Sequence, residues 1–407
     1  ECDWSSDVCS SDLLYEFIYM KSLSKAALNI DGQPMFKYLD KARKLEAEGR
    51  TMIHMEIGDP DFNTPANITM AAIRSLSEGR THYTSSWGET EFREAIRIAT
   101  YNSRGFMPDL NQVLVVPGAN IGIFYAVFTL CDPGTEVLVP DPGFATYYSS
   151  IKMCGVNAVH VPLKEEHGFR MQAADVRKLI TDKTRLLIIN SPNNPTGAVM
   201  TKEELKNIYD LCVEKDIYLY SDEIYSRMIY DHYEFTSPAQ YDNCKSHVIL
   251  SNGFSKAFAM TGWRLGSIIG PAEVMERMAA LLQTTSSCVS PFLQDAATEA
   301  IRGPQDQVYA MMAEYKKRRD ILVQGLNEVP GFKCQTPGGA FYAFPNITGT
   351  GLSDIEVCEQ LMDKTGVVTV PGSCFGQHGA GYIRLCYATD VYSIESALKR
   401  IKQWASK

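Results

Sequence analysis

Several familiar features are missing from this sequence. Its eleven cysteines form no Cys-x-x-Cys pair, a pattern that indicates free buried thiols in a reducing compartment, so we expect a cytoplasmic protein without a metal site. No stretch reaches the roughly 18 consecutive apolar residues that a membrane helix needs. The formal net charge is -9, with 39 basic and 48 acidic residues, which speaks against a nucleic-acid partner because phosphate binding needs a basic patch.

Two nucleotide-binding signatures are missing as well. Neither the G-x-G-x-x-G fingerprint of dinucleotide-binding folds nor the spacing of a P-loop occurs anywhere in the chain. A nicotinamide-dependent dehydrogenase is therefore disfavoured. Residues 1–12 have no helical or strand periodicity and resemble a translated sequencing-adapter remnant. We expect residues 1–19 to be a disordered, non-native leader, with natural translation beginning near Met20.

What is present is a long alternation of helix-like and strand-like segments. The chain has 407 residues, more than the roughly 250–300 that one hydrophobic core serves, which favours two domains. Helical periodicity covers 65–79 and 89–104, and Thr201 with Glu204 forms a capping box before a third helix. Short apolar runs lie at 113–116, 137–139, 186–189, 217–220 and 248–250. This alternation predicts an α/β unit with a mostly parallel central sheet covered by helices on both faces.

The pattern changes after about residue 303. It predicts, in chain order, a helix at 305–327, a strand at 340–344, a helix at 353–364, strands at 367–370 and 382–388, and a C-terminal helix. Such an order is typical of a smaller α+β domain. We therefore predict an N-terminal segment (20–60) that packs with the small domain, a large domain (61–303) and a small C-terminal domain (304–407).

Lys256 is the first candidate for chemistry. It lies in a stretch of small and apolar residues just after the predicted strand 248–250, with Arg264 nearby in the sequence. A lysine in a dry pocket beside another cation loses its preference for the charged form and becomes an amine suited to Schiff-base chemistry. A solvated surface lysine is the alternative, and by itself it is the commoner case.

Three other segments place polar groups at the ends of predicted strands. Asp222 follows the strand at 217–220, where ligands of parallel sheets bind; a helix cap or a surface acid is the alternative. The turn 191–197 contains two prolines that make it rigid and fix Asn194 with its amide facing inward. The turn at 118–120 precedes a helix and offers backbone N–H groups to a phosphate, which by itself is a weak indication.

The order and spacing of these elements resemble the class I and II aminotransferases of fold type I, which depend on pyridoxal phosphate. The Lys256 segment, the Asn-Pro-Thr-Gly turn at 194–197 and the pattern Asp222-x-x-Tyr225 resemble that family's cofactor motifs. Gly-Tyr-Ile-Arg-Leu-Cys-Tyr-Ala at 381–388 resembles its substrate-carboxylate motif, and residues 56–65 resemble its N-terminal strand and loop. The likeness extends from about residue 30 to the C-terminus.

The resemblance implies pyridoxal 5′-phosphate as a cofactor of the large domain, with a role for each matching residue. Lys256 would carry the cofactor covalently, and Asp222 would pair with its pyridine nitrogen and keep that nitrogen protonated. Tyr225 and Asn194 would contact the phenolic oxygen, and Phe144 would stack on the ring, although it could also be a core phenylalanine. The phosphate would be bound by Gly118, Ala119, Asn120, Ser255, Arg264 and, across a homodimer with shared active sites, the partner subunit's Tyr83.

The same resemblance implies a substrate site. Arg384 would hold the α-carboxylate through two parallel charge-assisted hydrogen bonds, where a surface ion pair is the alternative. Gly58 would let the N-terminal strand approach that carboxylate, Asn194 would also contact the substrate, and Tyr342 would line the pocket. The chain departs from the family at Gly253, where a phosphate-binding Ser or Thr is common, and the turn at 118–120 lacks a hydroxyl that some members have.

These roles predict a transaminase that moves an amino group from an L-amino acid, such as aspartate or alanine, to a 2-oxo acid, such as 2-oxoglutarate, by a ping-pong mechanism. Lys256, Asp222 and Tyr225 would be its catalytic residues. Two alternatives on the same fold stay open: a C–S β-lyase or synthase, and a non-catalytic cofactor-binding module. The donor is not indicated, because no second arginine is plainly placed to hold a side-chain carboxylate.

Overall fold

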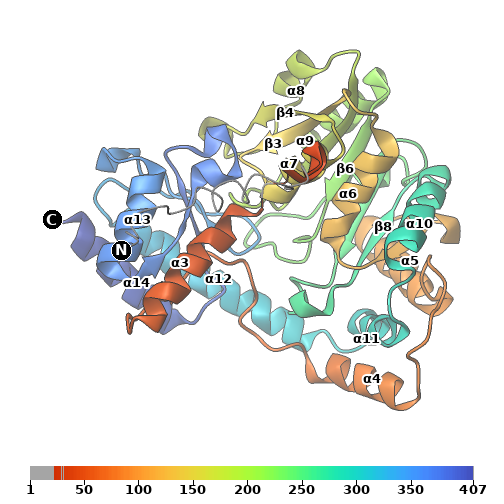
Figure 1. The fold of residues 1–407 in the computed structure, drawn as a ribbon, viewed down its shortest axis with the longest axis horizontal. Helices are drawn as coiled ribbons and strands as arrows, with labels where there is room; N and C mark the ends of the chain where they lie inside the picture. Colours follow the sequence, from red (N-terminus) through yellow and green to blue (C-terminus); the bar gives the residue numbers. More distant parts are fainter. Residues whose placement is uncertain (1–22, 29, 31, 407) are drawn as a thin grey trace, which may run out of the picture.

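The computed structural model describes residues 23–28, 30 and 32–406, so the expected leader lies outside the described residues. A seven-stranded sheet forms its centre (Figure 1). From one edge to the other, the strands are β2 (Val113–Val116), β8 (Gly266–Ile269), β7 (Val248–Gly253), β6 (Tyr218–Asp222), β5 (Thr184–Asn190), β3 (Glu136–Asp141) and β4 (Asn157–Pro162). Neighbours from β7 to β4 are parallel, and β8 runs antiparallel to both β7 and β2.

The sheet separates two hydrophobic cores. Successive side chains of a strand point to opposite faces, and in β2 Val113 and Val115 join one core while Leu114 and Val116 join the other. The first core includes side chains of α5 (Thr90–Arg104), α8 (Ala173–Leu179), α9 (Lys202–Lys215) and α11 (Pro291–Arg302). The second includes side chains of α6 (Ala119–Leu130), α7 (Ala145–Met153) and α10 (Ala272–Ser286). The predicted α/β architecture, a mostly parallel sheet covered on both faces, is confirmed.

The predicted elements are found with small shifts at their ends. All five predicted strands of the large sheet are present, and the capping box is formed, because the Thr201 hydroxyl accepts from the Glu204 backbone N–H and the Glu204 carboxylate accepts from that of Thr201. Two strands were not predicted. The edge strand β4 is mostly half-buried or exposed and therefore has no continuous apolar run. The short strand β8 begins with Gly266 and Ser267, which do not favour a strand by propensity.

The C-terminal part of the chain forms smaller sheets. Strands β11 (Val370–Pro371), β12 (Ile383–Cys386) and β9 (Tyr342–Ala343) pair in that order, all antiparallel, and are shorter than the predicted strands. Figure 1 shows α13 (Asp354–Thr365) and α14 (Val391–Ala405) to the left of the large sheet, and α12 (Asp306–Asn327) extends toward them from below the sheet.

The N-terminal segment packs with this C-terminal part. Strand β1 (Ile53–His54) pairs in parallel with β10 (Val367–Val368). Ala42 of α3 (Pro34–Ala47) joins a small core with Met52, Met362 and Val368. The domain boundaries near residues 60 and 303 stay predictions.

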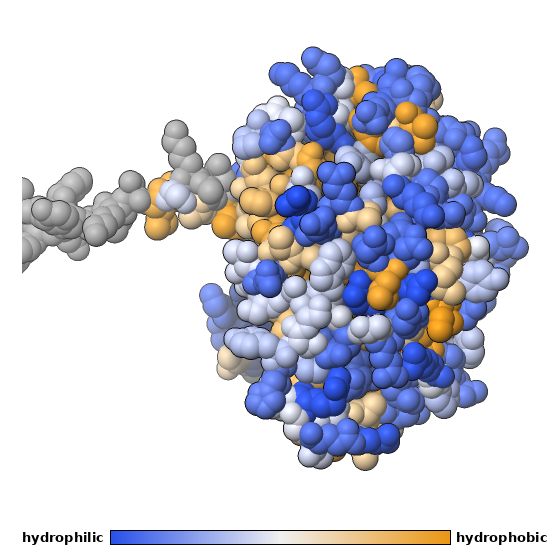
Figure 2. Space-filling view, turned by 90° about the vertical axis from the view of Figure 1, so that its right-hand side faces the viewer, coloured by the Kyte–Doolittle hydropathy of each residue, from blue (hydrophilic) through white to orange (hydrophobic). Residues whose placement is uncertain are grey.

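The surface is polar on the face shown in Figure 2, with apolar side chains scattered over it. No helix within the described part of the chain is both long and apolar enough to span a membrane. The nine cysteines of the described part all carry free thiols. In the same part, no three or more His, Cys, Asp or Glu side chains are grouped so that they could hold a metal ion.

Candidate active site

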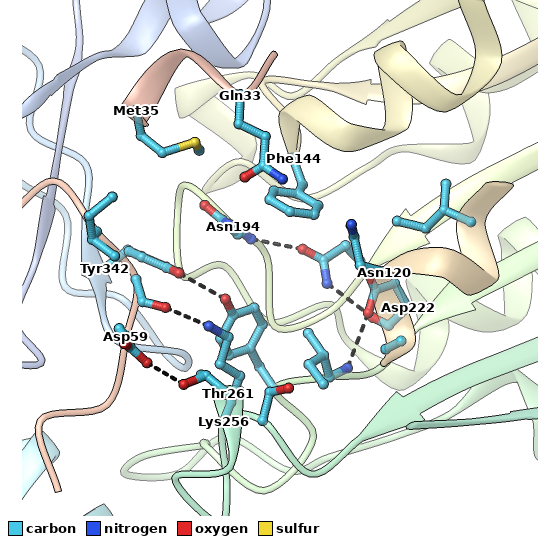
Figure 3. Close-up of a pocket in the computed structure, with 18 of the residues that line it drawn as sticks. Gln33, Met35, Asp59, Asn120, Phe144, Asn194, Asp222, Lys256, Thr261 and Tyr342 are labelled. Carbon is cyan, nitrogen blue, oxygen red and sulfur yellow. Dashed lines mark hydrogen bonds between the residues drawn. The ribbon is translucent and has the colours of Figure 1, made fainter. Parts of the chain in front are cut away.

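A cavity of about 410 Å³ opens at the carboxyl ends of the central parallel strands. Asn190 ends β5 and Asp222 ends β6, and Lys256 follows β7, so the topology brings three separate loops to one edge of the sheet. Figure 3 shows Asp222 and Lys256 converging with side chains from the N-terminal and C-terminal parts of the chain, such as Asp59 and Tyr342. Most of the predicted site residues line the cavity: Gly58, Ala119, Asn120, Phe144, Asn194, Asp222, Tyr225, Ser255, Lys256, Arg264, Tyr342 and Arg384.

Lys256 presents its amine to this cavity. The Nζ atom donates a hydrogen bond to the backbone carbonyl of Gly58 at 2.5 Å (Figure 3). Burial lowers the pKa of Lys256 from 10.5 to about 8; Cys386 and Asp59 oppose that shift, and the positive charges of Arg384 and Arg264 add to it. Part of this amine is unprotonated near neutral pH. Such a lysine is suited to act as a nucleophile and as a base.

Asp222 is buried and its hydrogen bonds are specific. One carboxylate oxygen accepts from the Tyr147 hydroxyl at 2.7 Å, and the other accepts from the backbone N–H of Ile224 at 3.2 Å. Burial raises the pKa of Asp222 to about 6, although the bonds from Tyr147 and Ile224 lower it. A cation next to this carboxylate would relieve the cost of burying its negative charge, so the site favours a positively charged ligand group.

Arg384 is a buried cation that forms no ion pair within the described part of the chain. It lies on β12 with its side chain 1% exposed, and it donates to the side-chain oxygen of Asn194 at 3.0 Å and to the backbone carbonyl of Glu56. Its Nε atom has no hydrogen-bond partner, and no carboxylate of the described residues forms an ion pair with it. Its guanidinium lies against the rings of Tyr342 and Phe375, 4.6 and 4.7 Å from their centroids. Buried charges are normally paired, so this arrangement calls for an anionic ligand.

The predicted phosphate end is built around the start of α6. Arg264 and Ser255 line the cavity beside Ala119 and Asn120, whose backbone N–H groups lie at the helix N-terminus. Gly118 is required there, because its φ is +88° and a Cβ would lie 2.4 Å from Nη2 of Arg264. Gly118 itself does not line the cavity.

Gly253 does not line this cavity either. It faces a second cavity, of about 540 Å³, on the other side of Ile224. A Cβ at this position would lie 2.8 Å from the Ile224 side chain. A side chain at residue 253 would therefore displace Ile224.

Tyr225, Tyr342 and Gly58 form one wall of the cavity. The hydroxyls of Tyr225 and Tyr342 lie 2.8 Å apart (Figure 3). A Cβ at Gly58 would lie 1.9 Å from the Tyr342 hydroxyl. Glycine is therefore needed at residue 58 for space, which allows the backbone to approach Tyr342 and Lys256 together.

Tyr83, like Gly118, is a predicted site residue outside the lining of the cavity. It is 88% exposed. Its expected role in the active site of a second subunit is not tested by a single chain, and it stays a prediction.

Several pocket residues were not identified from the sequence. Tyr147 and Asn190 had usable signals, since Tyr147 comes three residues after Phe144 and Asn190 directly follows the predicted strand at 186–189. Asp59 and Thr261 form a hydrogen bond of 2.7 Å at the edge of the pocket. Ile123 and Ile224 add apolar surface from the large domain. Four more come from the N-terminal segment, whose position depends on contacts distant in sequence: Gln33, Met35, Phe36 and Ile57.

Known proteins share this fold and sequence. The family described as aminotransferase class I and II matches residues 50–401. An aspartate aminotransferase of Pyrococcus horikoshii is 39% identical over 386 residues, covering 94% of this chain and 96% of that protein. The aromatic-amino-acid aminotransferase 2 of Thermococcus litoralis is 40% identical, covering 90% of this chain and 94% of that one. The structure of aspartate aminotransferase from Thermus thermophilus with maleate superimposes with a TM-score of 0.90, at 34% identity, over 94% of this chain and 100% of that one.

These matches extend over nearly all of the chain and include the segments that form the cavity. The protein therefore belongs to the class I and II aminotransferases of fold type I, and it is an amino-acid transaminase that uses pyridoxal phosphate.

Proposed function

We propose that the protein moves an amino group from an L-amino acid, such as aspartate or alanine, to a 2-oxo acid, with 2-oxoglutarate as the acceptor. The observation that supports this best is the placement of a neutralisable lysine, Lys256, in the same cavity as the buried and unpaired cation Arg384. Lys256 can move a proton at Cα of an amino acid, and Arg384 can bind the carboxylate of the same molecule.

The residues present fit pyridoxal phosphate. When bound, the cofactor supplies a cationic ring that withdraws electrons from the substrate Cα. Asp222 would hold the proton on the ring nitrogen, and Phe144 would lie against the ring, where its own ring already meets Tyr147 edge-on at 5.7 Å. Tyr225 and Asn194 would contact the phenolic oxygen. The phosphate would be held by Ser255, Arg264 and the backbone N–H groups of Ala119 and Asn120, with Gly118 giving Arg264 its space.

Lys256 would carry the cofactor and would also move the proton. At a pKa of about 8, about a tenth of the amine is neutral at pH 7, against well under a thousandth at the ordinary value of 10.5. Its hydrogen bond to Gly58 keeps the amine directed into the cavity. From there it would remove the proton from the substrate Cα and hold it for delivery to the C4′ carbon of the cofactor.

Arg384 would orient the substrate. Its guanidinium is held rigidly by Asn194, Glu56 and two aromatic rings, so a carboxylate that binds it takes a fixed position. Fixing the carboxylate and the amino group leaves the Cα–H bond directed toward Lys256, and orientation of this kind supplies much of the acceleration in such reactions.

We also propose that the protein is a cytoplasmic homodimer. The exposed ring of Tyr83 is accompanied by a row of exposed apolar side chains on α4 (Ala66–Ser77), where Met70, Ile73 and Leu76 are 55, 48 and 44% exposed. Residues three apart on a helix lie on the same face. A second subunit that covers this face would bring its own active site close to Tyr83.

The absorption spectrum of the cofactor-loaded protein tests the proposed activity. Adding the right amino acid should remove the visible band of lysine-bound cofactor, and 2-oxoglutarate should restore it. A band that persists while pyruvate accumulates would instead indicate a β-lyase. If no such band forms at all, Lys256 does not carry the cofactor.

A further inference from the structure

A buried carboxylate connects the large sheet to the loop that precedes β12. Asp141, at the end of β3, is 0% exposed. Its Oδ2 atom lies 2.9 Å from Nδ1 of His160 on β4 and 3.2 Å from Nδ1 of His378 in the 3₁₀ turn Gln377–Gly379, which follows β11. Its Oδ1 atom accepts the backbone N–H of His378 at 3.0 Å. Burial alone would raise the pKa of Asp141, but the bonds from the two histidines outweigh that effect and hold the pKa below its usual value.

The same two segments are joined at a second place. The backbone carbonyl of Phe375 accepts from the backbone N–H of Gly143 at 2.8 Å and from the Tyr148 hydroxyl at 2.9 Å. Gly376 fits against Asp141 only without a side chain, since its φ is +129° and a Cβ would lie 2.1 Å from Oδ1 of Asp141. The loop 375–378 is therefore seated on the end of β3 by several specific contacts.

Phe375 carries this connection into the substrate site. Its ring lies 4.7 Å from the Arg384 guanidinium, on which the Tyr342 ring also lies. On the other side of the contact, Gly143 is next to Phe144, which lines the cavity at the predicted position of the cofactor ring. The loop that supports Arg384 is thus fixed to the segment that presents Phe144.

We propose that Asp141, together with His378, positions Arg384 for the substrate carboxylate by holding the Phe375 loop against the large sheet. The inference rests on the proposed role of Arg384. Asp141 and His378 are positioning residues, because neither lines the cavity. Loosening this contact should weaken carboxylate binding and leave the proton transfer by Lys256 largely intact.

The test compares four variants of the cofactor-loaded protein. His378→Ala removes the imidazole bond to Asp141. His378→Asn keeps a side-chain N–H donor at a similar position, so it should rescue. His167→Ala removes an exposed histidine that lies 3.7 Å from Glu166, outside this contact, and is the matched control. Phe375→Leu keeps the backbone carbonyl contacts and removes the ring beside Arg384.

The measurements are the KM and kcat for an amino donor, and the dissociation constants of maleate and 3-phenylpropanoate, two carboxylates that have no amino group. We expect His378→Ala to raise KM and both dissociation constants about fivefold or more, the lower range of coupling between sites, with kcat changed less than about twofold. His378→Asn should return them to near wild type, and His167→Ala should not change them.

A double-mutant cycle separates positioning from general destabilisation. If His378 acts through Phe375, the effects of His378→Ala and Phe375→Leu on carboxylate binding are not additive. Additive effects, or unchanged dissociation constants in a folded His378→Ala protein, would overturn the inference. Arg384→Lys tests the proposed role of Arg384 separately. If that variant binds both carboxylates as well as wild type does, the role is wrong, whatever the His378 variants show.

Discussion

The amine of Lys256 donates its hydrogen bond to the backbone carbonyl of Gly58, a residue that precedes it by almost half of the chain. A Cβ at residue 58 would meet the Tyr342 hydroxyl, which itself bonds to Tyr225. There is therefore little free space between Lys256, the segment around Gly58 and the two tyrosines. We expect substitutions there to have specific effects.

Lys256→Ala should abolish transamination, because the variant has no amine to carry the cofactor or to move the Cα proton. It should still bind pyridoxal phosphate noncovalently, since the groups around the ring and phosphate remain. Single-turnover spectra with an amino acid measure this, and Lys245→Ala, at an exposed lysine, is the control. Appreciable turnover without added amines would contradict the assignment.

Lys256→Met should stabilise the cofactor-free protein at pH 7. The folded-state pKa of about 8 lies below the ordinary 10.5, so below pH 8 the protein pays to bury a charged amine that the unfolded chain exposes. Between about pH 8 and 10.5 the folded state loses its proton first, and wild-type stability gains on the variant. Melting temperatures across that range should show an advantage on the order of a few degrees that shrinks as the pH rises.

Asp222→Asn should slow the half-reaction with amino acid by roughly a hundredfold or more, the usual scale for a lost proton-holding group. The amide is nearly isosteric, and the Tyr147 and Ile224 contacts can remain, but it cannot keep the ring nitrogen protonated. Stopped-flow spectra give the rate, and Asp222→Glu should retain more activity than Asp222→Asn. Equal rates for Asp222→Asn and wild type would remove Asp222 from the mechanism.

Gly58→Ala should raise KM about tenfold through displacement of Tyr342, since overpacking costs about 1–3 kcal/mol. The matched control is Gly32→Ala, because no atom of the described residues lies within 4 Å of a Cβ placed there. Adding Tyr342→Phe to Gly58→Ala should restore part of the affinity, as it removes the nearest clashing atom. Steady-state kinetics of Gly58→Ala, Gly32→Ala and the double variant, each compared with wild type, measure these changes in KM.

Mixing Lys256→Ala with Tyr83→Ala subunits tests the shared active site. If Tyr83 completes the partner's phosphate site, a hybrid dimer contains one site with both residues intact, and mixing should restore activity above that of either variant. If Tyr83 acts within its own subunit, or has no role, the hybrid gains nothing. Sedimentation of the mixture confirms that hybrid dimers have formed.

Part of this site could be predicted from local sequence. The apolar runs that form β5, β6 and β7 mark the strand ends, and Asp222 and Lys256 come close after the predicted runs, at the edge of the sheet where ligands bind. The capping box at Thr201 is likewise local. Arg384 depended on resemblance to a family, because its partner Asn194 lies in a distant loop and no short-range pattern joins the two.

The rest depended on packing between distant segments. Gln33, Met35 and Phe36 reach the cavity because α3 packs beside β10, and nothing near residue 35 indicates that contact. The contact of His378 with Asp141 likewise joins a loop of the C-terminal part to the large sheet. The reversal of β8 could not be read from its residues either, since strand direction is set by the connection before it and the partners on both sides.

The parallel pairing of β1 with β10 joins residues 53–54 to residues 367–368, and Arg384 lies further still along the chain. During synthesis, domains generally fold from the N-terminus as they emerge, yet here strand β1 lacks its pairing partner until residues 367–368 have left the ribosome. The large sheet can assemble well before that moment. A nascent chain could therefore acquire the cofactor-binding surfaces of its large sheet while residues 367–368 and Arg384 are still to be made, but the ability to hold a substrate would come only after them.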